Sequence, residues 1–142
     1  MSRREVSAGQ VWRLGRHRLA VGDATDAELV RRLLGAERLR MVWADPPYGV
    51  DYAGKNEFLN ALDKGNCVQE AIAGDGAKPA EVEALVRRAL QLAHWRSAPG
   101  AACYVACPAG TSLPHFIRAF EGSGFEFKHS LAWVKNNFVL GR

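Results

Sequence analysis

The fold of this chain is decided by the run RMVWADPPYG at residues 40–49. The first five residues of the run are largely apolar and predict a short buried strand. The two prolines that follow fix φ at about −65° and lack a backbone N–H group, so their carbonyls point outward as acceptors in a rigid turn. Asp45 adds a carboxylate before the prolines, and Tyr48 adds an aromatic ring after them. Acceptors beside a stacking ring suit a flat group with an amino donor, such as a nucleobase. The simpler alternative is a proline-stiffened turn with a solvated aspartate.

The length and composition indicate one domain of ordinary globular type. The chain has 142 residues and a net charge of +4, which is enough chain to bury a core. No apolar run reaches the roughly 18 residues of a membrane span, and no apolar stretch typical of a secretory signal follows the first residues. The positive charge is compatible with nucleic acid but does not require it. Basic side chains gather near both ends of the sequence: Arg13, Arg16, His17 and Arg18, then Lys128, His129, Lys135 and Arg142.

The three cysteines, Cys67, Cys103 and Cys107, predict a reducing cytoplasm and no disulfide framework, because their number is odd and no secretion signal is found. Cys103 and Cys107 are four residues apart in a strand-like run, where alternation places both on one face. We expect both to be small buried core residues. The alternative is a zinc site that they form with His94 or Cys67. The spacing is not that of a Cys-x-x-Cys knuckle, so we expect no metal.

The start of the chain predicts a β-hairpin. Residues 10–14 and 17–21 have the pattern of two short strands, and Gly15-Arg16 fits a two-residue turn with glycine first. A helix follows, and the next strand carries the proline turn. Residues 17–44 therefore predict a strand–helix–strand unit, with a parallel strand pair and a right-handed crossover.

The helix in this unit has recognisable ends. Thr25 and Glu28 match a capping box, and Gly35 matches a helix stop. One face carries the apolar residues Leu29, Val30, Leu33 and Leu34.

The second half of the chain begins with a long loop at residues 51–78. A loop of this length in a compact domain is usually functional or mobile. The clearest helix of the chain then begins at Pro79, with apolar residues repeating at three and four. Three elements follow it: a strand at 101–106, a helix capped by Ser112 or Thr111, and a last strand at 125–134.

Asp45-Pro46-Pro47-Tyr48 at a strand end resembles the signature of the DNA methyltransferases that methylate base amines, N6 of adenine or N4 of cytosine, with S-adenosylmethionine. The wider run WADPPYGVDY at residues 43–52 resembles the branch that includes prophage and ParB-associated DNA methylases. The resemblance implies that Asp45 and the Pro46 carbonyl accept hydrogen bonds from the amine of a flipped-out base. It also implies that Pro47 shapes the turn and that Tyr48 stacks on the base. The form of the motif favours adenine over cytosine.

The chemistry of amine methylation explains these residue types. An aromatic amine is a weak nucleophile because its lone pair is conjugated into the ring. Two acceptors outside the ring plane draw the nitrogen toward a pyramidal geometry, so that it can attack the methyl of a sulfonium in line. This is catalysis by positioning and electrostatics, without a covalent enzyme intermediate. Taking the base out of the stack costs roughly a few kcal/mol, which stacking on Tyr48 partly offsets.

Five further residues receive candidate roles. Asp23 ends the second predicted strand, where ligands of open α/β sheets bind. The resemblance implies that Asp23 contacts the adenine of S-adenosylmethionine, although a turn acceptor before a helix explains it as well. Lys55 follows the motif and is a candidate for DNA phosphate, with an ordinary solvated lysine as the alternative. The run at 133–136 resembles a strand end beside the target base, and the alternative is a core aromatic followed by an exposed turn. Its candidate nucleic-acid contacts are Trp133, Lys135 and Asn136.

These features predict one α/β domain over residues 1–142. We expect a partial S-adenosylmethionine-dependent methyltransferase sheet of Rossmann-like type, with flanking helices, an amino-terminal hairpin, and residues 51–78 near the active site. The resemblance runs from about Gly9 to Arg142, but the sequence lacks the Phe-x-Gly-x-Gly segment that holds the amino-acid part of the cofactor in that family. We therefore expect the amino-terminal portion of a methylase, inactive alone. Its open apolar sheet edge would be covered by self-association or by the missing carboxy-terminal half as a separate chain.

The function expected from the sequence is a cytoplasmic, site-specific methyltransferase domain that acts on double-stranded DNA. The resemblance associates such an enzyme with restriction–modification or with phage and prophage. The alternative belongs to a different class: a catalytically inactive methylase fragment that binds nucleic acid or a partner chain through the same pocket.

Overall fold

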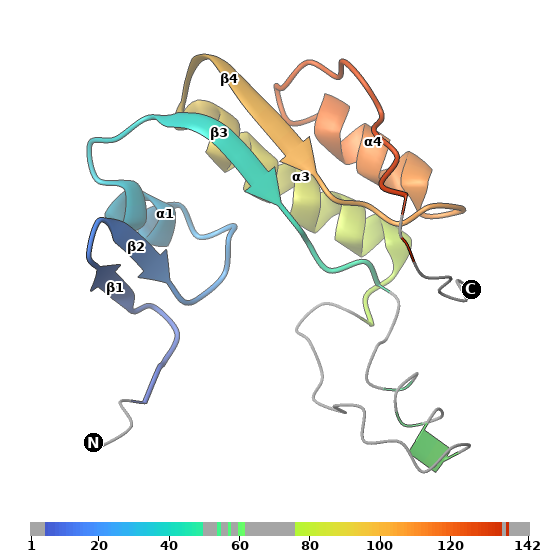
Figure 1. Ribbon diagram of the computed structural model, residues 1–142, viewed down its shortest axis with the longest axis horizontal. Helices are drawn as coiled ribbons and strands as arrows, with labels where there is room; N and C mark the ends of the chain where they lie inside the picture. The colour runs from blue at the N-terminus through green and yellow to red at the C-terminus, as the bar shows by residue number, and fades with distance from the viewer. Residues whose placement is uncertain are drawn as a thin grey trace.

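A computed structural model describes residues 5–49, 54, 57, 60–61, 76–134 and 136. The described residues form a small mixed α/β structure with an antiparallel and a parallel strand pair (Figure 1). The elements in chain order are β1 (Val11–Leu14), β2 (His17–Ala20), α1 (Ala27–Leu34), β3 (Leu39–Ala44), α3 (Pro79–Trp95), β4 (Ser97–Val105) and α4 (Leu113–Glu121). Most of the loop expected at 51–78 lies outside the described residues.

The hairpin of β1 and β2 confirms the prediction from its turn residues. The strands pair antiparallel with Leu14 opposite His17, so Gly15 and Arg16 alone make the turn. Gly15 has φ +63°, in the left-handed region that such turns need and that glycine adopts without steric cost. The hairpin is therefore set by local backbone chemistry.

The capping residue of α1 is Asp26, which corrects the predicted capping box at Thr25. The Asp26 carboxylate accepts from the backbone N–H groups of Glu28, at 2.9 Å, and Leu29, at 3.1 Å. Thr25 instead donates its backbone N–H to Asp23, at 2.7 Å. Asp26, one residue after Thr25, caps the helix instead, because its carboxylate accepts from two backbone N–H groups that have no partner within the helix. The end at Gly35 is as predicted, with φ +60° and its N–H bonded to Arg31.

The predicted parallel pairing of β2 with the motif strand is wrong. In the structure β2 pairs with β1, whereas β3 pairs parallel with β4. The first helix, α1, packs on the hairpin, and the Arg18 guanidinium donates to the Leu33 carbonyl at its end, at 2.9 Å. Because the hairpin itself covers the apolar face of α1, no crossover forms there. The parallel crossover of the described chain runs from β3 through α3 to β4.

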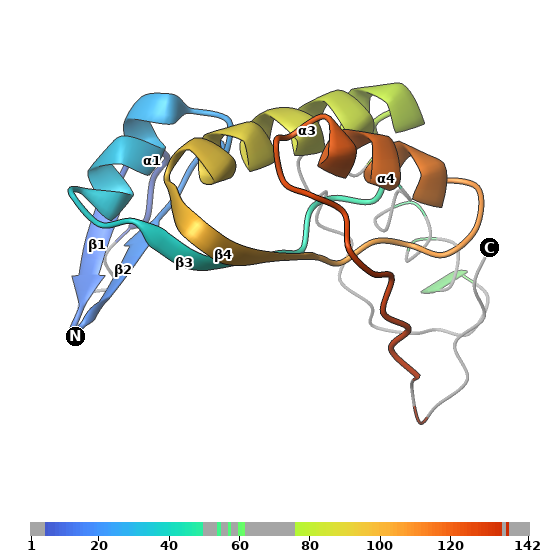
Figure 2. The same cartoon turned by 90° about the horizontal axis from the view of Figure 1, so that it is seen from above.

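The β3–β4 sheet has one face against helices. Val42 lies opposite Cys103 and Trp43 opposite Tyr104. The strand β4 begins earlier than predicted, at Ser97. The pairing register shifts after Leu39, so Pro99 and Gly100 have no partner among the residues of β3. Figure 2 shows α3 and α4 on the same side of this sheet. The core between them consists of Val82, Val86, Leu90, Phe116 and Ala119.

Both long helices begin where the sequence predicts. Pro79 opens α3, and the Glu81 carboxylate accepts from the backbone N–H of Lys78 at 2.9 Å. The last helix, α4, follows Ser112, although the Ser112 side chain makes no capping hydrogen bond. Phe116 and Ala119 form the buried stripe of α4, as amphipathic spacing requires.

Two predictions near the end of the chain are wrong. Residues 125–134 do not form a strand, because no neighbouring strand is present among the described residues to receive their backbone groups. Their first rings pack on helices instead, Phe125 against His94 and Phe127 against Phe120. Cys107 is exposed and lies beyond the end of β4, so it does not share a strand face with the half-buried Cys103.

No helix within the described ranges is both long enough and apolar enough to cross a membrane.

Candidate functional site

The proline turn lies at the carboxyl end of the parallel pair. The ladder continues to its edge, since the backbone N–H of Ala106 donates to the Ala44 carbonyl at 2.8 Å. Asp45 then leaves the sheet as an exposed residue, and the two prolines after it are half-buried. Ligands of parallel α/β sheets bind at this edge. The position of the turn is therefore suitable for a binding site.

Asp45 and Tyr48 are joined within the turn. The Tyr48 hydroxyl donates to Asp45 Oδ1 at 2.6 Å. The half-buried Tyr48 ring packs edge-on against Phe116 of α4, with the ring centroids 6.0 Å apart and the planes at 75°. The structure thus brings the predicted acceptor and the predicted stacking residue together and adds Phe116, which sequence reasoning missed. The three-residue spacing across a proline turn was a usable signal for the hydroxyl contact, whereas nothing local indicated Phe116.

Gly49 fixes the end of the turn against the start of α3. Its φ is +71°, and a Cβ there would lie 2.7 Å from the Ala77 carbonyl oxygen and 3.2 Å from Val82 Cγ2. Any side chain would therefore collide with backbone. From the sequence Gly49 was only a flexible position after the prolines. The structure shows that it permits the close approach of the turn to α3.

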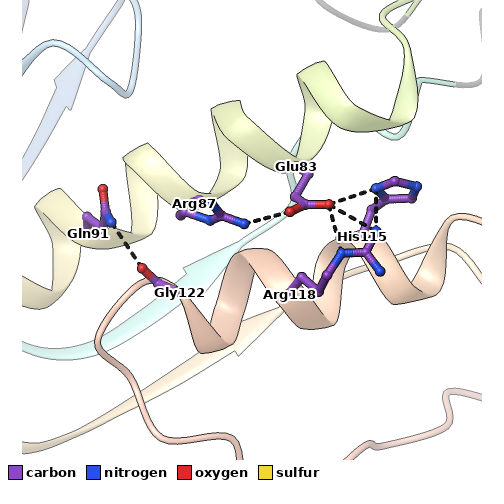
Figure 3. Close-up of polar contacts among 6 residues, drawn as sticks. All are labelled: Glu83, Arg87, Gln91, His115, Arg118 and Gly122. Carbon is purple, nitrogen blue, oxygen red and sulfur yellow. Dashed lines mark hydrogen bonds and ion pairs between the residues drawn. The ribbon is translucent and has the colours of Figure 1, made fainter.

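A polar cluster holds α4 on α3 beside this turn (Figure 3). Glu83 of α3 faces His115 Nδ1 at 2.8 Å and accepts from the Arg118 guanidinium at 3.1 Å and from Arg87 at 2.6 Å. A hydrogen bond from His115 to Glu83 needs a proton on Nδ1, because a carboxylate cannot donate. The same Nδ1 atom lies 2.9 Å from the Arg118 guanidinium, which only donates, so Nδ1 bonds one of these two partners at a time. The hydrogen bond from His115, followed by the one from Arg118, holds the pKa of Glu83 below its ordinary value. Gln91 adds a hydrogen bond to the Gly122 carbonyl at 3.0 Å.

The cluster around Glu83 is linked to the turn through α4. His115 and Phe116 are adjacent in α4, so the cluster fixes the helix that carries the ring against which Tyr48 packs. The sequence placed Glu83 only in the first turns of a helix, and its role depends on the tertiary packing of α4.

Asp23 lies in the loop between β2 and α1 and is engaged locally. It accepts from the Thr25 backbone, and this hydrogen bond, followed by one from the Thr25 side chain, lowers the pKa of the exposed Asp23 carboxyl. The charge of Arg88 on α3 acts in the same direction. The turn-acceptor role is thus present in the structure. No hydrogen bond joins Asp23 to the Asp45 turn among the described residues.

Two of the four candidate nucleic-acid residues, Trp133 and Asn136, fall among the described residues. Trp133 is 83% exposed and makes no ring contact with any described aromatic residue. Asn136 is also exposed. Lys55 and Lys135 lie outside the described residues, so these two predictions have no structural counterpart.

Cys103 and Cys107 belong to no metal-binding cluster among the described residues, and Cys67 lies outside those residues. Within the described part of the chain, no group of three or more histidine, cysteine or acidic side chains could hold a metal ion. Burial raises the pKa of the Cys103 thiol to about 11 and also raises that of Cys107. Both shifts disfavour the thiolate form that binds metals.

Comparisons with protein-family models, with curated proteins and with solved structures found no match. What the chain does must therefore be inferred from its own residues.

Proposed function

We propose that this chain is part of an S-adenosylmethionine-dependent DNA methyltransferase that transfers a methyl group to an exocyclic base amine, with adenine favoured over cytosine. The observation that supports the proposal is the turn from Asp45 to Tyr48 at the carboxyl end of a strand in a parallel pair. In this proposal β3 and β4 belong to a Rossmann-like sheet, and the partner is double-stranded DNA.

Each residue of the turn has a distinct task in this reaction. The exposed Asp45 carboxylate and the Pro46 carbonyl accept from the target amine, Pro47 keeps the turn rigid, and Tyr48 offers its ring to the base. Acceptors held in place before the substrate arrives stabilise the developing positive charge on nitrogen without reorganisation.

The described residues fit only part of the cofactor. An exposed carboxylate such as Asp23 is a suitable acceptor for the adenine amine of S-adenosylmethionine. The described residues around Asp23 offer no glycine-rich loop before a helix for its amino-acid part. When bound, the cofactor supplies an electrophilic methyl group on a sulfonium. The first test is a calorimetric titration of the chain with S-adenosylmethionine, in which binding that weakens in Asp23→Ala supports the assignment.

The decisive test of the function is methyl transfer. The chain is complemented with a carboxy-terminal methylase half that supplies the glycine-rich cofactor segment and is incubated with double-stranded DNA and S-adenosylmethionine labelled in the methyl group. Label in N6-methyladenine or N4-methylcytosine is measured. Asp45→Ala and Tyr48→Ala should abolish transfer while leaving the fold intact. Glu37→Ala removes a comparable exposed carboxylate away from the turn and should have no effect. Transfer that persists in Asp45→Ala would contradict the mechanism.

A second function is favoured by the exposed face of the β3–β4 sheet. Met41, Trp43 and Tyr104 are exposed there, with Trp43 66% accessible, and contiguous apolar surface of this kind marks interaction sites. The alternative is a non-catalytic module that binds nucleic acid or a partner chain. Sedimentation of the chain alone, with and without DNA, distinguishes it: a stable complex without methyl transfer or cofactor binding supports the binding module.

A further inference from the structure

The Asp45 carboxylate is already engaged within its own motif. Its Oδ1 atom accepts from the Tyr48 hydroxyl at 2.6 Å. That separation is typical of a strong hydrogen bond from a hydroxyl to a charged carboxylate, at about 2.5–2.7 Å. Asp45 is otherwise exposed, and an exposed aspartate without such a bond samples several rotamers. The bond therefore restricts a side chain that would otherwise move.

Both ends of this hydrogen bond are held by rigid structure. The two prolines between Asp45 and Tyr48 limit the backbone of the turn. The Tyr48 ring packs against the α3–α4 core and meets Phe116 edge-on at 6.0 Å. Gly49 then seats the turn on α3, where a Cβ would meet the Ala77 oxygen at 2.7 Å. Because the donor is fixed before any ligand arrives, little conformational entropy is lost when it orients the carboxylate.

We propose that the Tyr48 hydroxyl is a positioning group: it holds Asp45 by Oδ1 and so presents Oδ2 as the acceptor for the target amine. This inference rests on the proposed function and gives Tyr48 a task beyond stacking. The ring and the hydroxyl then contribute separately, with the ring binding the base and the hydroxyl fixing the direction of the acceptor. Phe116 acts indirectly, because it packs against the Tyr48 ring and so fixes the position of the hydroxyl.

The two tasks of Tyr48 are separated by comparing Tyr48→Phe, which keeps the ring, with Tyr48→Ala, which loses both groups. Tyr48→Phe should lower kcat for methyl transfer about tenfold, the usual effect of one hydrogen bond to a charged group, with KM unchanged. Tyr48→Ala should abolish transfer, because the base then also loses the ring on which it stacks. Ser7→Ala removes a hydroxyl from an exposed residue ahead of β1 and is the control. An unchanged kcat in Tyr48→Phe overturns the positioning role.

A second measurement needs no catalysis, so it decides the positioning role even if the wild-type chain transfers no methyl group. Side-chain NMR couplings of Asp45 report its χ1 rotamers in the free protein. The wild type and Ser7→Ala should show one dominant rotamer, and Tyr48→Phe should show averaging. Averaging already present in the wild type, or an unaltered Asp45 in Tyr48→Phe, overturns the inference. Absent methyl transfer in the complemented enzyme, with a fixed Asp45, counts against the proposed function alone.

Discussion

The two faces of the β3–β4 sheet are built from neighbouring residues and have opposite environments. Cys103 and Val105 point toward α3 and α4 and pack against the core. Trp43 and Tyr104 come from the same two strands, lie opposite each other in the register, and are exposed with their rings 5.7 Å apart. Because both faces are apolar, the helices decide which face is buried. A strand that is apolar on both sides is typical of a sheet covered on both faces.

The difference between the two faces shows which side of the sheet holds the functional turn in place. Tyr48 packs on Phe116. Gly49 lies close to Ala77 and Val82. The described contacts that fix the turn therefore come from the covered side of the sheet. The exposed side contributes a free apolar surface. The site is therefore expected to depend on the packing of α3 and α4 and to tolerate changes on the other face.

The largest expected effect compares one aromatic residue from each side. Phe116 is 5% exposed and Trp43 is 66% exposed. Phe116→Ala should lower the free energy of unfolding by about 3–5 kcal/mol, since it leaves a cavity in the core. Trp43→Ala should cost about 1 kcal/mol, mainly from the lost contact with Tyr104. Urea denaturation measures both, and equal losses would mean that the exposed face is covered in solution.

A smaller effect is expected where the turn meets α3. Gly49→Ala meets both a left-handed backbone, φ +71°, and the Ala77 oxygen at 2.7 Å, and should cost about 2–4 kcal/mol from strain and displacement together. Gly15→Ala is the control, because Gly15 has φ +63° with nothing within 4 Å of a Cβ. It should cost about 1–2 kcal/mol from the backbone alone. Equal costs in urea denaturation would show that the turn moves away from α3 easily.

What the sequence predicted correctly is largely local. Gly15 specifies its own turn, and the periodic apolar residues after Pro79 specify α3. The errors concern choices between distant or competing partners. The strand β3 pairs with β4, which no residue of β3 encodes alone, and residues 125–134 have a strand-like pattern without a strand to pair with. Asp26 replaced Thr25 as the cap because two good capping residues are adjacent.

In the candidate site, too, the sequence indicated the local features and did not indicate the long-range contacts. Asp45, Pro46, Pro47 and Tyr48 were found because their types and order define a rigid acceptor turn. The contact of Tyr48 with Phe116 and the approach of Gly49 to Ala77 were missed. Each joins residues that are far apart in the chain, so only the tertiary packing brings them together.

The polar cluster on the covered side predicts a pH effect. The pKa of Glu83 is lowered in the folded state, first by the hydrogen bond from His115, relative to an ordinary value of 4.5. Its contribution to stability is therefore complete above that value and is lost as the pH falls through the lower folded pKa. Glu83→Gln should weaken this part of the acid dependence of urea denaturation. Glu28→Gln is the control, because Glu28 pairs with Arg31 on the exposed face of α1 and should matter less. An unchanged acid profile in Glu83→Gln would show that the cluster does not hold α4.

The smallest effect concerns the rate of thiol alkylation. This rate reports how well α3 and α4 shield the covered face of the β3–β4 sheet from solvent. Cys103 is half-buried in β4 with its pKa raised to about 11, and Cys107 is exposed beyond the strand. Since the thiolate is the reactive form, iodoacetamide at neutral pH should modify Cys107 well before Cys103, as site-resolved mass spectrometry would show. Denaturant should remove the difference, and Phe116→Ala should accelerate Cys103 selectively because it opens the packing beneath β4. If Cys103 reacts in the folded wild type as fast as Cys107, α3 and α4 do not shield that face of the sheet from solvent. The turn that depends on their packing would then not be rigid.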